Sequence, residues 1–190
     1  MSQSVSSKTT SLWLIALLCA APIAASYFAY YFAQPTGRTN YGELLQAPPL
    51  PPARLELVDG SAFDIGRLKG KWVLLMVDSG RCDEFCRRKL FTLRQLRLAQ
   101  GKDMERIERA WLIDDGAMPP AALINEYEGT WMVRGAGSEL LSRLPAQSSV
   151  ADHIYVVDPL GNLVMRYPRN ADPMRIIKDL ARLLGASQIG

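Results

Sequence analysis

Two cysteines stand four residues apart in the sequence Cys-Asp-Glu-Phe-Cys, which runs from Cys82 to Cys86. A thiolate is the nucleophile of disulfide exchange and a soft ligand for metals such as Cu(I). Residues four apart on a helix have Cα atoms about 6 Å apart, which is within disulfide range. The pair follows an apolar run and opens a predicted helix, whose first backbone N–H groups favour a negatively charged sulfur. This context predicts a redox or metal function; the competing interpretation is two unrelated buried cysteines.

Strands and helices alternate on both sides of the pair. The continuous apolar run 72–77 is typical of a strand buried on both faces, and 84–99 carries leucines at helical spacing. The predicted strands are 54–58, 72–77, 109–113, 154–157 and 163–167, and the predicted helices are 84–99, 120–127, 139–144 and 174–184. The last two strands are joined by an Asp-Pro-Leu-Gly turn as a hairpin. This order predicts an α/β fold with a central mixed sheet flanked by helices.

An uncharged segment of 22 residues, from Leu12 to Ala33, precedes these elements. About 20 apolar residues cross a bilayer as a helix, and aromatic residues stand near both ends of the segment, as at a membrane interface. We predict a cytoplasmic N-terminus at 1–11 and a transmembrane anchor at 12–33; a cleaved signal peptide is the alternative. The proline-rich segment 34–52 is predicted to be a linker, and 53–190 to be one globular domain.

The composition excludes several classes of protein. The chain has 190 residues, a net charge of +3, three cysteines and one histidine. The small charge argues against a nucleic-acid partner, and three cysteines are too few for a disulfide-dense scaffold. A single histidine excludes a multi-histidine zinc site. The third cysteine, Cys19, lies within the predicted anchor, where we expect it to be inert.

Charged residues near the pair have two interpretations each. The stretch 81–109 holds nine Lys or Arg residues against five Asp or Glu residues. It either steers an acidic partner or forms a solvated helix face. Asp78 either relays the thiol proton or binds backbone N–H groups of the loop, and Asp152 has the same two interpretations.

Several segments resemble a known family. Leu55 to Val77, L-x-L-V-D-G-S-A-F-D-I-G-R-L-K-G-K-W-V-L-L-M-V, is similar to the entry of thioredoxin-like domains in membrane-tethered periplasmic proteins. The C-x-x-x-C spacing, W-L-I-D-D at 111–115 and I-Y-V-V-D-P-L-G at 154–161 make the chain similar to the Sco/SenC family. Those proteins are copper chaperones and thiol reductases that assemble the copper centre of cytochrome c oxidase. The resemblance spans about residues 50–184 and implies a thioredoxin-like fold.

The resemblance also implies a function. The chain would be a single-pass protein of the bacterial inner membrane with its C-terminal domain in the periplasm. It would assist copper-centre assembly by thiol–disulfide reduction, by Cu(I) delivery, or by both. Its partner would be an oxidase subunit or another periplasmic thiol protein. Cys82 and Cys86 correspond to the family's thiolates, and the implied copper ligands are Cys82, Cys86 and His153.

The histidine departs from the family pattern. The family's ligand position falls at Val150, whereas His153 stands three residues later. Along an extended strand an odd offset points a side chain to the opposite face, unless a bulge intervenes. His153 is therefore either the third ligand or an ordinary histidine at the start of a strand. Asp152 stands where thioredoxins keep a cis-proline, a residue that normally shapes their substrate groove.

Two alternative functions stay open at this point. One is a general periplasmic thiol–disulfide oxidoreductase that serves cytochrome maturation, which would make the protein an enzyme. The other is a non-catalytic, membrane-anchored scaffold in which the two cysteines form a structural disulfide. In the thiol-reduction mechanism of the Sco-like function, Cys82, which lies nearer the helix start, attacks a partner disulfide and Cys86 resolves the mixed disulfide.

Overall fold

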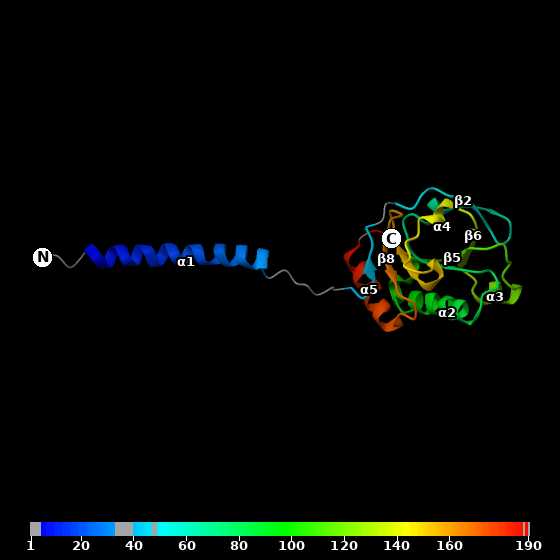
Figure 1. The fold of residues 1–190 in the computed structure, drawn as a ribbon. Helices are drawn as coiled ribbons and strands as arrows, with labels where there is room; N and C mark the ends of the chain where they lie inside the picture. Colours follow the sequence, from blue (N-terminus) through cyan, green and yellow to red (C-terminus); the bar gives the residue numbers. More distant parts are fainter. Residues whose placement is uncertain (1–4, 33–39, 47–48, 188, 190) are drawn as a thin grey trace. The chain divides into compact units, whose positions relative to one another are not determined.

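The computed structural model describes residues 5–32, 40–46, 49–187 and 189 (Figure 1). The chain divides into two units, one up to Thr39 and one from Asn40. The first unit contains α1 (Val5–Phe32), which includes Pro22. Its segment Thr10–Tyr31 is long and apolar enough to cross a membrane. The expected apolar helix is therefore confirmed, and the last residue of the predicted anchor, Ala33, lies outside the described residues.

The second unit is built around one mixed sheet. Its strands are β1 (Glu43–Leu44), β2 (Arg54–Leu57), β3 (Ala62–Asp64), β4 (Trp72–Asp78), β5 (Ile107–Ile113), β6 (Thr130–Arg134), β7 (Ile154–Val157) and β8 (Leu163–Tyr167). They lie in the order β1-β8-β7-β4-β5-β6-β2-β3. Strands β4, β5 and β6 are parallel, while the other neighbours pair antiparallel. The predicted mixed sheet and the predicted β7–β8 hairpin are confirmed.

Helices cover both faces of the sheet, and Figure 1 shows α2 and α4 on opposite sides of the strands. The helices are α2 (Glu84–Leu98), α3 (Ala121–Glu126), α4 (Glu139–Ser142) and α5 (Pro173–Ala186), with short 3-10 helices η1 (Ile65–Leu68), η2 (Gly101–Arg106) and η3 (Val150–Asp152). A hydrophobic core lies on each face of the sheet. Strand β4 contributes side chains to both cores, because successive side chains of a strand point to opposite faces. Leu74 and Met76 pack with α2 and α5. Val73 and Leu75 pack on the other face with η1 and α4.

Three strands of the structure, β1, β3 and β6, were not among those predicted from the sequence, and β3 pairs antiparallel with β2. Strand β6 was not predicted, although Thr130 to Arg134 lies between Gly129 and Gly135 and contains β-forming residues. It pairs in parallel with β5 and extends the sheet toward β2. Strand β1 has only two residues and lies in the segment predicted as a linker. Such a short strand forms only because β8 offers an open edge.

The start of the globular domain also differs from the expectation. It was predicted at residue 53, whereas the compact unit of the structure begins at Asn40. The backbone N–H groups of Tyr41 and Gly42 each donate to the Asp179 carboxylate of α5 at 2.9 Å. Gly42 also lies so close to Met165 that a Cβ atom would stand 2.3 Å from the sulfur. Backbone hydrogen bonding and close packing therefore hold the start of this segment against the domain.

We expect Asp179→Ala to lower the free energy of unfolding by about 2–3 kcal/mol, because the substitution leaves buried N–H donors without an acceptor. Asp179 is itself 2% exposed. Chemical denaturation of the full-length protein in detergent micelles, followed by tryptophan fluorescence, measures the change. The control is Lys178→Ala at the exposed neighbouring position of α5, which should change the value little. Equal effects of the two substitutions would contradict this account.

Candidate functional site

The cysteine pair lies where strand β4 passes into helix α2. Strand β4 ends at Asp78, and Ser79, Gly80 and Arg81 form the loop that precedes Cys82. Asp83 caps α2, since its carboxylate accepts the Cys86 N–H at 2.9 Å. The predicted helix over 84–99 is therefore confirmed, but it starts after Cys82. Only Cys86 lies within the helix, in its first turn.

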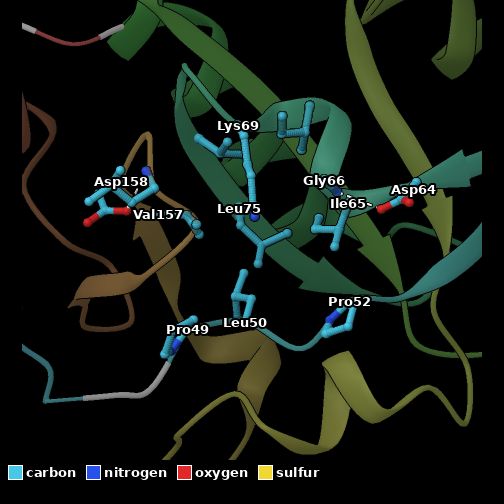
Figure 2. Close-up of a pocket in the computed structure, with 14 residues that line it drawn as sticks. Pro49, Leu50, Pro52, Asp64, Ile65, Gly66, Lys69, Leu75, Val157 and Asp158 are labelled. Atoms are coloured by element: carbon cyan, nitrogen blue, oxygen red, sulfur yellow. Dashed lines mark hydrogen bonds between the residues drawn. The ribbon is translucent and has the colours of Figure 1, made fainter.

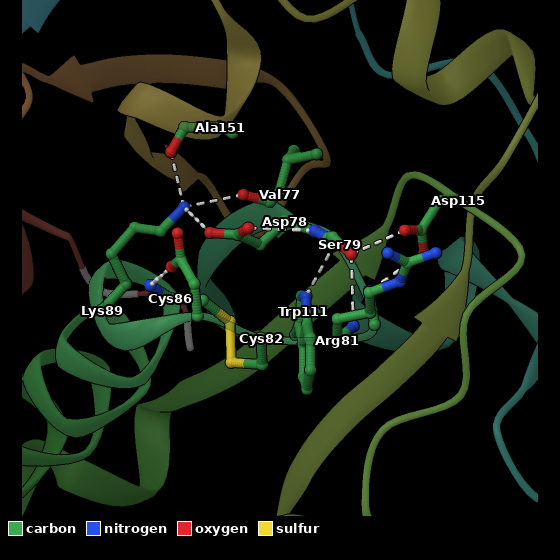
Figure 3. The surroundings of a disulfide bond; sticks show 12 residues. Val77, Asp78, Ser79, Arg81, Cys82, Cys86, Lys89, Trp111, Asp115 and Ala151 are labelled. Atoms are coloured by element: carbon green, nitrogen blue, oxygen red, sulfur yellow. Dashed lines mark hydrogen bonds and ion pairs between the residues drawn. A yellow bond between two sulfur atoms is a disulfide. The ribbon is translucent and has the colours of Figure 1, made fainter.

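Cys82 and Cys86 are joined by a disulfide, with their Cα atoms 5.1 Å apart (Figure 3). Both residues are buried, Cys82 being 3% exposed and Cys86 fully enclosed at 0%. Cys82 has φ +47°, a left-handed backbone conformation that is unusual for a residue with a side chain. Such strained residues concentrate at functional sites, where the surrounding structure holds them in place. The arrangement places a disulfide, which two electrons would reduce to two thiols, at the start of a helix.

The loop before Cys82 is held by Asp115, which lies beyond the end of β5. Its carboxylate accepts the Ser79 hydroxyl at 2.6 Å and the Gly80 N–H at 3.0 Å. These hydrogen bonds, the Ser79 hydroxyl first, lower the pKa of Asp115. Gly80 is required here, because a Cβ atom would stand 2.0 Å from the Ala117 carbonyl oxygen. Hydrogen bonds thus join the loop after β4 to the loop after β5, and they fix the backbone that leads to Cys82.

Lys89 is a buried cation one turn beyond Cys86. Its ammonium group donates to the Val77 carbonyl at 2.7 Å and the Ala151 carbonyl at 2.5 Å, and it pairs with the Asp78 carboxylate at 2.7 Å (Figure 3). The residue is 5% exposed. Burial lowers the pKa of Lys89, and the contact with Asp78 opposes that shift. Lys89 therefore connects α2 with the end of β4 and with η3.

The acidic groups near the pair have structural contacts. Asp78 accepts the Ser79 N–H at 2.9 Å and pairs with Lys89, so it stabilises the loop as one of its two interpretations predicted. Asp114 is partly buried, and burial followed by its acidic neighbours raises its pKa. Asp152 accepts from the Ser148 hydroxyl at 2.8 Å and pairs with Arg169. Asp152 thus belongs to an ion pair at the loop before β7.

His153 does not join the cysteine pair. Ile154 and Val156 pack in the core that contains the cysteines, whereas Tyr155 packs in the core on the other face. The His153 backbone is extended, and its ring lies edge-to-face with Tyr155, with ring centres 5.8 Å apart. Its Nδ1–H donates to the Tyr167 carbonyl at 3.0 Å. His153 is 8% exposed, so it is a buried histidine at the start of a strand.

Within residues 5–32, 40–46, 49–187 and 189, no three or more His, Cys, Asp or Glu side chains gather as a metal site would require. The structure therefore brings together two of the three expected copper ligands, and these two are bonded to each other. A three-ligand site made of Cys82, Cys86 and His153 does not fit this geometry.

Lys89 and Asp115 are the site residues that the sequence-based reasoning missed. In the sequence, Lys89 is one of nine basic residues in the stretch 81–109, and Asp115 is the last residue of the segment W-L-I-D-D. A signal for Lys89 exists in the sequence, because position 89 lies on the same helix face as Cys86, Leu90 and Leu93. A lysine on an apolar face requires a buried partner. No comparable signal identifies Asp115, because its partners are distant in sequence.

A cavity of about 320 Å³ lies away from the cysteines, on the η1 side of the sheet (Figure 2). Leu50, Ile65, Leu75 and Val157 line it, with Asp64, Lys69 and Asp158 among its polar residues. Leu75 and Val157 pack in the core opposite to that of the disulfide. This cavity is therefore separate from the disulfide.

The family model described as "transmembrane-like, thioredoxin-like, C-terminal domain" matches residues 72–187. Copper-bound ScoI of Bradyrhizobium japonicum is similar in structure, with a TM-score of 0.54 and 20% identity over 71% of this chain and 99% of that one. BsSco, a member of the Sco family of cytochrome c oxidase assembly proteins, gives a TM-score of 0.57 and 13% identity over 78% of this chain and 100% of that one.

The thioredoxin domain of a thiol–disulfide oxidoreductase from Bacteroides vulgatus gives a TM-score of 0.54 and 19% identity over 75% of this chain and 99% of that one. No curated protein matches the chain. These likenesses confirm the predicted thioredoxin-like fold and the structural resemblance to Sco proteins.

The buried ammonium group should give stability a distinct pH dependence. Lys89 loses its proton at a lower pH in the folded protein than in the unfolded chain, where its pKa is near 10.5. Between the two pKa values the unfolded chain binds more protons, so the free energy of unfolding contributed by Lys89 rises with pH. We expect Lys89→Met to lack this rise in denaturation curves at successive alkaline pH values. Lys102→Met, at an exposed position, should keep it; persistence of the rise in Lys89→Met would refute the assignment.

Proposed function

Because the chain belongs to the family of transmembrane-like, thioredoxin-like C-terminal domains, we propose that it is a membrane-anchored thiol–disulfide exchange protein. The observation that carries this proposal is the Cys82–Cys86 disulfide at the junction of β4 and α2. The strained backbone of Cys82 and the cap at Asp83 place this bond at a helix N-terminus. A thiolate formed there is stabilised by the helix dipole.

The proposed reaction moves two electrons between two cysteine pairs. In the reduced protein the Cys82 thiolate attacks one sulfur of a partner disulfide and displaces the other as a thiolate. The Cys86 thiolate then attacks the Cys82 sulfur, which releases the second partner thiolate and forms the Cys82–Cys86 disulfide. The partner is reduced and this protein is oxidised, so a further dithiol donor must restore it. Cys82 is the attacking residue because it lies outside the helix and is the less enclosed of the two.

We assign the protein to the bacterial inner membrane, with α1 as its anchor and the domain in the periplasm. Residues 1–11 would be cytoplasmic. An oxidised cysteine pair supports this orientation, because disulfides persist in the periplasm and are reduced in the cytosol. The proposed partner is the copper-binding subunit of cytochrome c oxidase, or another periplasmic thiol protein. The structural likeness to Sco proteins supports the first of these partners.

Copper delivery is the weaker part of the expectation. Two thiolates suit Cu(I) and become available once the disulfide is reduced. His153, however, packs with Tyr155 on the other face of the sheet and donates to a backbone carbonyl. The proposal therefore assigns exchange, and no step through copper, to the cysteine pair.

A non-catalytic scaffold is the second candidate, and the burial of the disulfide favours it. With exposures of 3% and 0%, neither cysteine offers its sulfur freely to a partner. A structural disulfide restricts the unfolded chain and is resistant to reduction by ordinary thiols. The two functions therefore differ in whether the bond exchanges.

We expect the reduced Cys86→Ser protein to accumulate a mixed disulfide with an added peptide disulfide, because Cys82 attacks and nothing resolves the product. Cys82→Ser should accumulate far less, since its remaining cysteine is enclosed in the helix. Non-reducing electrophoresis and mass spectrometry of the full-length protein measure both adducts. A wild-type bond that glutathione or dithiothreitol cannot reduce under native conditions would favour the scaffold.

We expect His153→Ala to leave the Cu(I) affinity of the reduced protein unchanged, because the histidine ring faces away from the cysteines. An anaerobic titration against a chromogenic Cu(I) chelator measures the affinity in full-length protein. Cys82→Ser serves as the positive control, since it removes one of two thiolates and should weaken binding strongly. A marked loss of affinity in His153→Ala would restore the histidine as a ligand.

A further inference from the structure

The outer face of α2 beside the disulfide combines arginines with exposed aromatic surface. Arg87 and Arg88 are exposed, and the large apolar side chain of Phe91 is 50% exposed. Phe85, which lies between the two cysteines in sequence, is partly exposed. Arginine and aromatic residues are enriched at protein–protein contacts. We name the set Phe85, Arg87, Arg88 and Phe91 the α2 surface.

Two grooves border the α2 surface. One, of about 160 Å³, is lined by Phe85 and Arg88 together with Pro168 and Asn170 from the segment after β8. The other, of about 370 Å³, is lined by Arg87, Arg88 and Phe91 together with Tyr127, which follows α3. Arg88 borders both grooves. The α2 surface is therefore a ridge with recesses on each side that can receive the side chains of a bound segment.

Positive charge dominates this region. Arg169 lies 4.4 Å from the Phe85 ring centre, and Arg94 lies 5.2 Å from that of Tyr127. The acidic groups nearby have contacts of their own: Asp152 pairs with Arg169, Glu84 pairs with Arg88, Asp83 accepts the Cys86 N–H, and Glu126 lies beside Tyr127.

A carboxylate of a bound segment can readily replace Glu84 as the ion-pair partner of Arg88. The side chains of Glu84 and Arg88 are 87% and 58% exposed, and exposed pairs of this kind contribute little to stability. Arg87 has no ion-pair partner among the residues that the structure describes.

We propose that the α2 surface docks an acidic segment of a protein substrate, the segment that carries the disulfide to be exchanged. This inference rests on the proposed exchange function and adds the substrate class to it. Carboxylates of the segment would pair with Arg87 and Arg88, while apolar side chains would cover Phe91. Opposite charge across such a contact steers encounter and sets register more than it adds affinity. Docking would place the substrate disulfide beside Cys82, at the start of the same helix.

Binding can be measured apart from chemistry. The full-length oxidised protein in detergent micelles is titrated with a fluorescent peptide that represents the substrate segment. In this peptide, serines replace the two substrate cysteines, and glutamates flank the serines. A second peptide carries lysines in place of the glutamates. Fluorescence anisotropy should show tighter binding of the glutamate peptide, and added salt should weaken that binding.

The chain offers a matched pair of variants. Arg88 and Arg143 are 58% and 59% exposed, and each pairs with a glutamate four residues earlier. Arg143 follows α4, which packs on the opposite face of the sheet. Arg88→Glu should weaken binding of the glutamate peptide about fivefold at an ionic strength of about 0.1 M, since charges at the contact act within a Debye length of ~10 Å. Arg143→Glu makes the same change in net charge and should leave the affinity unchanged.

The outcomes separate this inference from the function on which it rests. Arg88→Glu should also bind the lysine peptide more tightly than wild type does, which a misfolded variant would not do. Equal affinity for both peptides, or equal loss in Arg88→Glu and Arg143→Glu, would overturn the docking surface. Exchange is then followed with the reduced protein and the cysteine-containing glutamate peptide. Absence of exchange alongside charge-dependent binding would refute the proposed function and leave the docking surface in place.

Discussion

The geometry of the disulfide site depends on the contacts of one buried group, the ammonium group of Lys89. It is an interior charge, tolerated because the Asp78 carboxylate and two backbone carbonyls surround it. These partners lie at the end of β4 and in η3, while Lys89 itself lies one turn beyond Cys86 on α2. A single side chain thus sets the position of the cysteine helix relative to the central strand and to the segment that precedes β7. Removing it would leave the partly buried Asp78 carboxylate beside the disulfide loop without its ion-pair partner.

The sheet divides the chemistry of the domain between its two faces. The disulfide lies in the core formed with α2 and α5, whereas His153 contacts Tyr155, which packs in the other core. A strand keeps this division because successive side chains point to opposite faces. With the histidine separated from the cysteines, the site is a disulfide, and the chemistry that we propose for it is two-electron exchange. In the proposed docking, the exposed Arg87 and Arg88 side chains on the outer face of α2 would distinguish one partner from another.

Much of the fold could be predicted from residue patterns. The apolar run of β4, the leucine spacing of α2 and the Asp-Pro-Leu-Gly turn between β7 and β8 each report a local property, so the predicted bounds agree closely with the structure. Strands β1, β3 and β6 were missed because all three are short and depend on a neighbouring strand for their pairing. The segment from Asn40 was assigned to a linker for the same reason. Its proline content suggested an extended chain, but Asp179, more than a hundred residues later, holds Tyr41 and Gly42 in place.

The sequence by itself determined the spacing of the cysteine pair, its position between a buried strand and a helix, and an apolar segment long enough for a membrane span. These are properties of residues close together in the chain, where spacing and periodicity suffice. Only the tertiary structure decided that His153 faces away from the pair, that Lys89 is buried and that Asp115 holds the loop. Each of these depends on which segments meet across the sheet. Such contacts follow from strand order and register, which no local pattern reports.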